Sequence, residues 1–513
     1  MKTISDNSNK RIVKNSALLY VRMIFLMLIN LYAARIILHS LGVENYGIYN
    51  AVGGFISMFS MLSSSLTTAI GRFLTYTLGE NDDVKLNKVF SASVIIQLIL
   101  CGLLLIVAET VGVWFLNYKM TIPCGREFAA NCVFQFSLVT FVINLMSVPY
   151  NSMLIAHEKM GAFAYIGIFE GIATLCIAFL IKVSPIDVLI FYSVLMCSVA
   201  LLTRMIYGFY CKANFVESKV RWNFDKDLIK KMFSFAGWNF IGTTSGVLRT
   251  QGINMLYNVF YGPVVNAAYG LSMQVFNAVN KFSSNFYTAV QPQITKSYAQ
   301  SDKERSFYLV CTGSRLAFYL LMLIICPLLW NTNYLLFLWL SDVPPYTESF
   351  VRIVLLFCLI ESFSQPLIYL MLANGRIRNY QLIVGGLYLL NFPVAWLLLC
   401  LGMSPEYVQS TMIVFSFIGL FLRLIMLKSM IDFPMFRFLR ETICRVLFVV
   451  IFVSAIVYIY SCLNEGTGLM NFILSTLIIE VAILLVIYLC GLNSKEKTFI
   501  KSKIRFQHAS NRA

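Results

Sequence analysis

Long apolar runs divide the chain into fourteen candidate membrane spans. A run of roughly 17–25 apolar residues is long enough to cross a bilayer as a helix. Between the sixth and seventh runs lies a polar segment, residues 211–231. The pattern predicts an all-α polytopic membrane protein with about 14 transmembrane helices, near residues 16–38, 50–74, 91–117, 128–150, 163–181, 186–210, 233–259, 264–291, 308–330, 349–372, 380–401, 406–429, 444–462 and 469–491.

Composition agrees with this class. Hydrophobic residues make up 59% of the 513 residues and charged residues 12%, whereas soluble domains are about 25% charged. The 13 cysteines are scattered without a CxxC pair, and there are three histidines. We therefore expect neither a disulfide framework nor a metal or other cofactor.

Basic residues predict the orientation, because short loops rich in Lys and Arg stay on the cytoplasmic side. With both termini inside, the inner segments hold 28 of the 40 basic residues. The seven outer loops hold Lys119, Arg126 and Lys182. We therefore expect both termini to be cytoplasmic. The net charge of +16 is explained by this asymmetry and by attraction to anionic lipid, so no nucleic-acid partner is needed.

The chain repeats itself after about 220 residues. The stretch "TAIGRFLTYTLGENDD" from Thr68 resembles "TAVQPQITKSYAQSDK" from Thr288, and "NYG" at Asn45 resembles "AYG" at Ala268. A third pair, around Pro149 and Pro366, has an offset of 217. Spans one to six and seven to twelve thus predict two six-helix bundles related by a pseudo-twofold axis along the membrane normal. The expected domains are residues 1–210, a cytoplasmic linker at 211–231, residues 232–430, and two accessory helices with a basic tail at 431–513.

One face of the eighth span is polar. Its small and polar positions recur at alternating spacings of four and three, which places them on one side of a helix. The corresponding helix in the first half repeats the pattern without a charge. A polar face in both halves indicates a wet cavity. The positions in the eighth span are Gly270, Gln274, Asn277, Lys281, Ser284, Thr288 and Gln291.

Basic residues inside the spans are the leading candidates for substrate contact. Lys281 lies near the middle of span eight, Arg249 near the middle of span seven, and Arg22 inside span one. A charge at mid-bilayer costs roughly 2.5–3.5 kcal/mol on insertion scales and usually faces a cavity or a partner. None of these three spans contains Asp or Glu, so an anionic ligand, particularly a phosphate, is the expected counter-charge.

Structural roles are the alternative for each of these bases. Lys281 can bond to backbone carbonyls or pair with Glu361 or Glu170. Arg35 lies toward the end of span one, where a long side chain can reach the interface. Four further arginines are expected to be interfacial anchors: Arg204, Arg315, Arg352 and Arg423.

The stretch "LGVENYGIYNAVGGF" (Leu41 to Phe55), after "AARIILHS", resembles the opening of the polysaccharide (O-antigen type) flippases of the multidrug/oligosaccharidyl-lipid/polysaccharide exporter superfamily. This resemblance covers most of the chain. It implies alternating access that moves an undecaprenyl-diphosphate-linked oligosaccharide to the periplasmic leaflet for lipopolysaccharide or other surface polysaccharide. It also implies a bacterial inner-membrane location and, as further partners, polysaccharide assembly proteins. The expected substrate-binding residues are Arg22, Arg35, Arg249, Lys281, Asn277, Gln274 and Ser284.

Two other function classes stay open. A multidrug exporter of the same superfamily uses intramembrane carboxylates, which spans one, two, seven and eight lack. A polysaccharide polymerase or glycosyltransferase needs acid and base groups beside its substrates, and the inner pair Asp225 and Asp227 is typical of a solvated helix start. A GxxxxGK[ST] loop is also absent from the sequence. We expect a protein that is not an enzyme.

Overall fold

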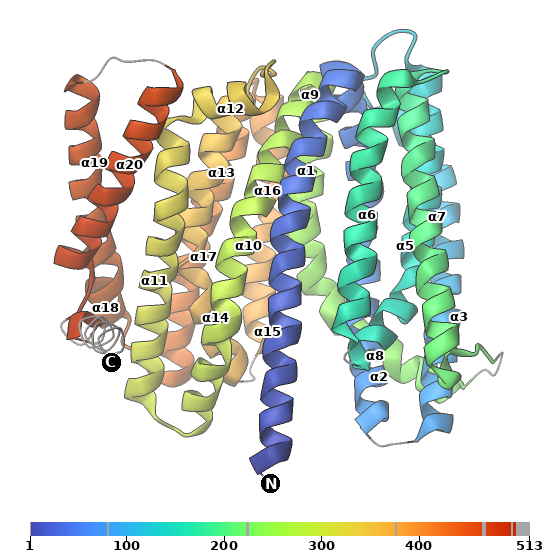
Figure 1. Cartoon of the computed structure of the whole chain (residues 1–513), viewed down its shortest axis with the longest axis horizontal. Helices are drawn as coiled ribbons and strands as arrows, with labels where there is room; N and C mark the ends of the chain where they lie inside the picture. The colour runs from blue at the N-terminus through green and yellow to red at the C-terminus, as the bar shows by residue number, and fades with distance from the viewer. Residues whose placement is uncertain are drawn as a thin grey trace, which may run out of the picture. The chain divides into compact units, whose positions relative to one another are not determined.

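The protein is described by a computed structural model that covers residues 2–79, 82–157, 159–221, 225–374, 377–463, 468–493 and 496–498. Within these residues all regular secondary structure is helical (Figure 1). Helices occupy all fourteen ranges predicted from the sequence. Ten helices of the described residues are long and apolar enough to cross a membrane, or eleven if the bent pair α13 and α14 is one span. The all-α polytopic class is therefore confirmed, and the count of fourteen spans stays a prediction.

The chain folds into two compact units. Unit 1 comprises residues 1–274, 342–347 and 385–408, and unit 2 comprises the remainder. The helices of unit 1 are α1 (Lys2–Met58), α2 (Ser60–Gly79), α3 (Asp83–Val107), η1 (Ala108–Gly112), α4 (Val113–Tyr118), α5 (Glu127–Ala156), α6 (Met160–Leu180), η2 (Ile181–Val183), α7 (Val188–Asn214), η3 (Val216–Ser218), α8 (Lys226–Val247), η4 (Leu248–Gly252), α9 (Ile253–Tyr261), the first part of α10 (Pro263–Ala299) and α16 (Gly386–Cys400).

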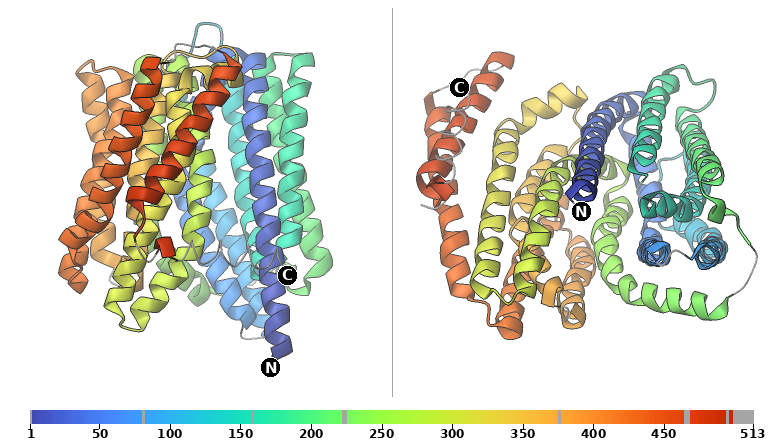
Figure 2. Two further views of the ribbon diagram at one scale, coloured as in Figure 1. Left: turned by 60° about the vertical axis from the view of Figure 1, so that its left-hand side comes forward. Right: turned by 60° about the horizontal axis from the view of Figure 1, so that its bottom comes forward.

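Unit 2 is built from the rest of α10 and the later helices. Its accessory pair, α19 and α20, lies beside α11 (Figures 1 and 2). The helices are α11 (Lys303–Trp330), α12 (Thr332–Leu340), α13 (Thr347–Glu361), α14 (Ser364–Asn374), α15 (Ile377–Tyr380), η5 (Gln381–Gly385), most of α17 (Pro405–Ile431), α18 (Met435–Phe438), η6 (Leu439–Cys444), α19 (Arg445–Leu463), α20 (Leu469–Val486) and η7 (Ile487–Gly491).

Aspartate caps begin several helices after polar loops. The carboxylate of Asp82 accepts a hydrogen bond from the backbone N–H of Lys85 at 2.9 Å, and Asp225 does the same for Leu228 at 3.0 Å. Such a cap satisfies a helix N–H that has no partner inside the helix and contributes about 1 kcal/mol. Asp225 therefore has the helix-starting role that the sequence indicates for it.

The core of unit 1 forms where the apolar faces of its helices meet. Helix α5 packs along α7, α1 along α6, and α2 along α8. Ile70 and Leu74 of α2, Phe90 of α3 and Met153 of α5 are fully buried in one cluster. Many large apolar side chains point outward instead, for example Ile106 of α3, which is 69% exposed. Apolar residues on both sides of a helix are typical of helices surrounded by lipid.

One connection differs from the sequence prediction. The segment expected to link spans one and two, residues 39–49, is helical, and the helix is interrupted only at Gly42, where φ is 76° and ψ is 165°. Only glycine adopts this left-handed backbone without steric cost.

Candidate functional site

The two halves of the repeat share one local backbone feature. Gly262, between α9 and α10, has φ 78° and ψ −171°, which is close to the conformation of Gly42. Both glycines separate a helix from a following helix that carries a Tyr-Gly pair, Tyr46-Gly47 in one case and Tyr269-Gly270 in the other. The weak similarity between "NYG" and "AYG" therefore marks the same local structure twice in unit 1. In each case a helix ends at a glycine, and a second helix that carries the Tyr-Gly pair follows.

Small residues allow the helices after these breaks to approach closely. A Cβ atom added to Gly47 would lie 1.8 Å from the backbone oxygen of Pro263, and one added to Gly54 would lie 2.1 Å from Nδ2 of Asn254. On α10, a Cβ added to Gly270 would lie 2.7 Å from Oδ1 of Asn50. The second half of α1 thus packs against α9 and the start of α10 with no room for larger side chains.

Polar side chains connect the same three helices. The Gln274 Nε2 donates to the Tyr46 hydroxyl at 2.6 Å, and Asn254 Nδ2 donates to the backbone oxygen of Asn50 at 3.0 Å. Asn266 Nδ2 in turn donates to the backbone oxygen of Asn254 at 2.6 Å. Gln274, one of the predicted substrate-binding residues, therefore has a protein partner in this structure, and its amide helps to hold α10 against α1.

A π-helical turn, η4, carries Arg249. A π turn widens the helix by one residue, disturbs the usual i to i−4 bonding and is frequent at functional sites. Here the Tyr269 hydroxyl donates to the backbone oxygen of Thr250 at 2.8 Å. The Arg249 guanidinium carbon lies 4.8 Å from the centroid of the Tyr388 ring of α16, and the side chain is half-buried. Tyr269 and Tyr388 together fix the turn and the direction of the arginine, the latter through a cation–π contact.

The polar face of α10 continues into unit 2. Lys281 is half-buried, while Asn277 and Ser284 on the same face are exposed. The Ser284 hydroxyl donates to the backbone oxygen of Lys281 at 3.0 Å. In the described part of the chain no acidic side chain forms an ion pair with Lys281. Lys281 is thus a partly exposed base beside two exposed polar side chains.

The alternative partner Glu361 is occupied within unit 2. Its Oε2 accepts from the Ser416 hydroxyl at 2.6 Å, and its Oε1 lies 4.0 Å from Nη2 of Arg423. Glu361 ends α13 at the bend toward α14. The carboxylate therefore belongs to a structural cluster at the break between two helices.

Predicted site residues are distributed over both units. Arg35 is half-buried on α1 and belongs to unit 1 together with Arg249 and Gln274. Asn277, Lys281 and Ser284 belong to unit 2. The side chain of Arg22 lies outside the described residues. That these side chains line one cavity stays a prediction.

Two arginines predicted to be interfacial anchors are instead buried. Arg315 and Arg423 are each 1% exposed. Arg315 Nη2 lies 2.5 Å from Glu496 Oε1, and its Nη1 donates to the backbone oxygen of Glu441 at 3.1 Å. Arg423 Nη1 donates to the Ser364 hydroxyl at 3.0 Å. The anchor prediction was wrong for both, because acidic partners from distant segments allow the charges to be buried.

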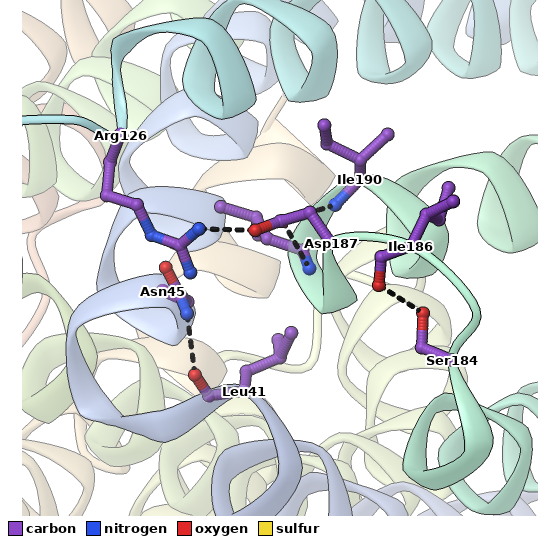
Figure 3. A network of polar contacts seen from close by, with 8 residues as sticks. Leu41, Asn45, Arg126, Ser184, Ile186, Asp187 and Ile190 are labelled. Atoms are coloured by element: carbon purple, nitrogen blue, oxygen red, sulfur yellow. Dashed lines mark hydrogen bonds and ion pairs between the residues drawn. The ribbon is translucent and has the colours of Figure 1, made fainter.

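An ion pair joins the loops that precede α5 and α7 in unit 1 (Figure 3). Arg126, before α5, pairs with Asp187, whose carboxylate also accepts from the backbone N–H groups of Leu189 and Ile190 at the start of α7. Partial burial raises the pKa of Asp187, but the hydrogen bonds and the charge of Arg126 outweigh this and hold the pKa below its ordinary value. Arg126 and Asp187 thus hold the starts of α5 and α7 together, beside Asn45 of α1 (Figure 3).

Three tyrosines that contact residues of the candidate site were not predicted from the sequence. Tyr46, Tyr269 and Tyr388 each supply a ring or hydroxyl to a residue of the site. The repeated Tyr-Gly pair is the sequence signal for the first two. Nothing in the sequence indicates Tyr388. Among the described residues no group of three His, Cys, Asp or Glu side chains is arranged to hold a metal ion.

A comparison with protein families gives one match. The family described as polysaccharide biosynthesis protein matches residues 12–298, more than half of the chain. A comparison with the sequences of curated proteins gives no match.

Solved structures share the fold. The lipid II flippase MurJ in an inward closed conformation has a TM-score of 0.65 at 12% identity, covering 92% of this chain and 98% of that chain. An inward-facing multidrug resistance MATE transporter of the MOP superfamily has a TM-score of 0.64 at 14% identity, covering 80% and 96%. A MOP superfamily transporter from Pyrococcus furiosus, described as having a binding pocket of reverse polarity, has a TM-score of 0.59 at 13% identity, covering 81% and 96%.

The resemblance noted from the sequence is confirmed at the level of family and fold. These two comparisons rest on different observations, one on the sequence of residues 12–298 and the other on the course of nearly the whole backbone. The chain therefore belongs to the polysaccharide biosynthesis protein family and is a multi-pass membrane protein with the fold of the MOP superfamily transporters.

Proposed function

We propose that this protein moves an undecaprenyl-diphosphate-linked oligosaccharide from the cytoplasmic to the periplasmic leaflet of a bacterial inner membrane, for the synthesis of a surface polysaccharide. The observation that carries the proposal is Lys281, a half-buried cation in the middle of a long helix, without an acidic partner among the described residues. Family membership supports a role in polysaccharide synthesis, and the fold it shares with a lipid II flippase supports a lipid-linked substrate.

The chemistry of such a substrate matches the side chains of α8, η4 and α10. A diphosphate is anionic, and Arg249 offers a forked donor while Lys281 offers a compact charge. Charge-assisted hydrogen bonds of this kind are about twice as strong as neutral ones. Asn277 and Ser284 can replace water around sugar hydroxyls, and the polyprenyl tail can stay in lipid. Arg22, Arg35 and Gln274 complete the proposed substrate-binding set.

Beyond the shared fold, we also propose a detailed architecture for transport. We infer fourteen spans with both termini cytoplasmic, and two six-helix bundles, residues 1–210 and 232–430, that alternate access around the substrate. Residues 211–231 link the bundles, and α19 and α20 are accessory. Support comes from the repeated glycine breaks at Gly42 and Gly262. The protein then needs no catalytic group or cofactor, and polysaccharide assembly proteins are its proposed partners.

Deletion of the gene in the native host tests the proposal. The lipid-linked glycan should accumulate in the cytoplasmic leaflet, and wild type should restore its export. Lys281→Ala and Arg249→Ala should each reduce export at least about tenfold, since loss of one charged hydrogen bond costs about 1.5–3 kcal/mol. Lys119→Ala, an exposed lysine of an outer loop, is the matched control and should export normally. Full export by both Lys281→Ala and Arg249→Ala would remove the residue assignment.

Multidrug export is the second candidate, because a multidrug MATE transporter shares the fold. Dye efflux that depends on this protein, without any change in surface glycan, would favour that function over the flippase. A polymerase or glycosyltransferase would instead change the length of a glycan when the purified protein is added to it.

A further inference from the structure

A pocket lies in unit 2, and none of the residues assigned to the substrate lines it. It has a volume of about 290 Å³ and is lined by residues near the end of α10, the start of α11, the end of α14 and the end of α17. These helix ends belong to the side that the distribution of basic residues predicts to be cytoplasmic. Its lining includes Tyr298, Lys303, Phe307, Leu370, Asp432 and Phe433.

The walls of this pocket are fixed by contacts within unit 2. Asp432 follows α17 in a left-handed conformation, with φ 55°, and ends the helix in a sharp turn. The turn directs Phe433 onto Phe307, with ring centroids 5.4 Å apart. On the other side the Asn374 Nδ2 donates to the Tyr298 hydroxyl at 2.6 Å. The pocket is therefore formed before any ligand binds.

Its charges are arranged for a ligand that carries both signs. Lys303 and Asp432 line the same pocket and are both exposed. In the described residues they form no ion pair with one another or with other side chains. Two opposite charges on the lining of one pocket, not paired with each other, suit a zwitterion, whose anion meets the lysine and whose cation meets the carboxylate.

The volume of the pocket and the residues around it restrict the class of ligand further. Sites for drug-sized ligands measure roughly 300–1,000 Å³, so a pocket of about 290 Å³ suits a compact headgroup and is too small for a diphosphate with an oligosaccharide. Leu370, Phe307 and Phe433 give it an apolar floor beside the charged rim. An apolar floor with a charged rim, at the level of basic residues beside a bilayer, fits a phospholipid.

We propose that this pocket binds the headgroup of phosphatidylethanolamine. The phosphate lies against the Lys303 ammonium group and accepts from the Tyr298 hydroxyl. The ethanolamine ammonium donates to the Asp432 carboxylate, and the glycerol and first acyl carbons lie on the apolar floor. Phosphatidylcholine has no N–H donor for Asp432, and phosphatidylglycerol has no cation, so the site selects ethanolamine among these lipids.

Lipid retention by the purified, full-length protein tests this proposal. Delipidated protein in detergent is titrated separately with phosphatidylethanolamine, phosphatidylcholine and phosphatidylglycerol, and bound lipid is counted by native mass spectrometry. Wild type should bind phosphatidylethanolamine at least about tenfold more tightly than phosphatidylcholine, the effect of one charge-assisted hydrogen bond. Asp432→Asn should abolish this preference, and Asn tolerates the left-handed conformation. Lys303→Ala should weaken binding of both lipids.

Matched controls are the exposed residues Asp342 and Lys119, whose Asn and Ala variants should bind as wild type does. Equal affinity of wild type for ethanolamine and choline lipids would overturn the proposal, even if a variant failed to fold. So would tightest binding of phosphatidylglycerol that depends on Lys303 and not on Asp432, since that result assigns an anionic headgroup. The readout does not involve glycan export, so it stands or falls independently of the proposed function.

Discussion

Arg315 and Lys281 are both basic residues within helices of unit 2, but their surroundings differ. Arg315 is 1% exposed and pairs with Glu496, while its second nitrogen binds the backbone of Glu441. Glu441 precedes α19 and Glu496 follows α20, so one side chain fastens both ends of the accessory pair to α11. Lys281 remains half-buried beside the exposed Asn277 and Ser284.

The difference separates structural charges from candidate binding charges. Burying an ion costs several kcal/mol unless a partner of opposite charge repays it. Arg315 and Arg423 are each paired with a glutamate of their own unit, so their charges are compensated without a ligand. Lys281 lacks an acidic partner in the described residues, so its charge is available for an anionic ligand. Four changes test or refine this comparison.

Arg315→Ala should have the largest effect on stability. It leaves the Glu496 carboxylate nearly buried without its partner, which costs about 3–5 kcal/mol of unfolding free energy. Thermal and denaturant unfolding of the purified protein measure the loss. Arg352→Ala is the matched control, because Arg352 and Glu348 form an exposed pair one helical turn apart, worth about 0.3–0.5 kcal/mol. Similar losses for both variants would contradict a special role for the buried pair.

Tyr269→Phe should have a moderate effect. It removes one donor to the backbone oxygen of Thr250 in η4, which keeps its hydrogen bond from the Ile253 backbone N–H, so the loss is that of a single hydrogen bond, about 0.5–1.5 kcal/mol. Because Arg249 lies on the same π turn, export should fall as well. Tyr261→Phe is the control: this more exposed hydroxyl also donates to a backbone oxygen, that of Met403, but water can replace it. Normal export by a folded Tyr269→Phe protein would show that the turn does not position Arg249.

Lys281→Ala should change stability by no more than about 1 kcal/mol, or raise it, because an uncompensated charge inside a membrane helix costs roughly 2.5–3.5 kcal/mol to insert. Export should nevertheless be lost. Unfolding and export are measured on the same preparation. A loss of stability as large as that of Arg315→Ala would place Lys281 among the structural charges.

Asp187→Asn should have the smallest effect, because the pair with Arg126 is partly exposed and such pairs contribute about 0–1 kcal/mol. The folded-state pKa of Asp187 is lowered, so the pair stabilises the fold above the unfolded pKa of about 3.9 and is lost as the pH falls through the lower folded value. The thermal midpoints of variant and wild type should therefore differ slightly at pH 7 and converge below about pH 4. A constant difference down to pH 3 would exclude the ionised carboxylate as the cause.

Local patterns predicted the helices well, and they predicted the connections less well. Apolar runs predict each helix because its length is set by the bilayer and its backbone bonds lie within one segment. The helical course of residues 39–49 was not predicted, since this polar stretch reads as a loop. A single glycine at position 42 turns the chain there, and several polar side chains that follow face protein. Asn45, for example, donates to the backbone oxygen of Leu41 at 2.8 Å.

The candidate site was predicted in part. The alternating spacings on α10 identified Lys281, Asn277 and Ser284 as one face, because helical periodicity is a property of the segment itself. The same reasoning grouped Gln274 with them, although its amide is bound to Tyr46, more than two hundred residues away. Periodicity specifies which side chains share a face, and it does not specify what that face meets.

The sequence by itself determined the membrane class, the helical segments and the polar face of α10, because hydropathy, charge and periodicity act over short stretches. Only the tertiary structure decided which charges have partners. Arg315 reaches a glutamate 181 positions later, Arg249 lies over Tyr388, and Lys303 and Asp432 meet at one pocket. These pairings depend on which helix ends are packed side by side, and that arrangement is set by packing between distant segments.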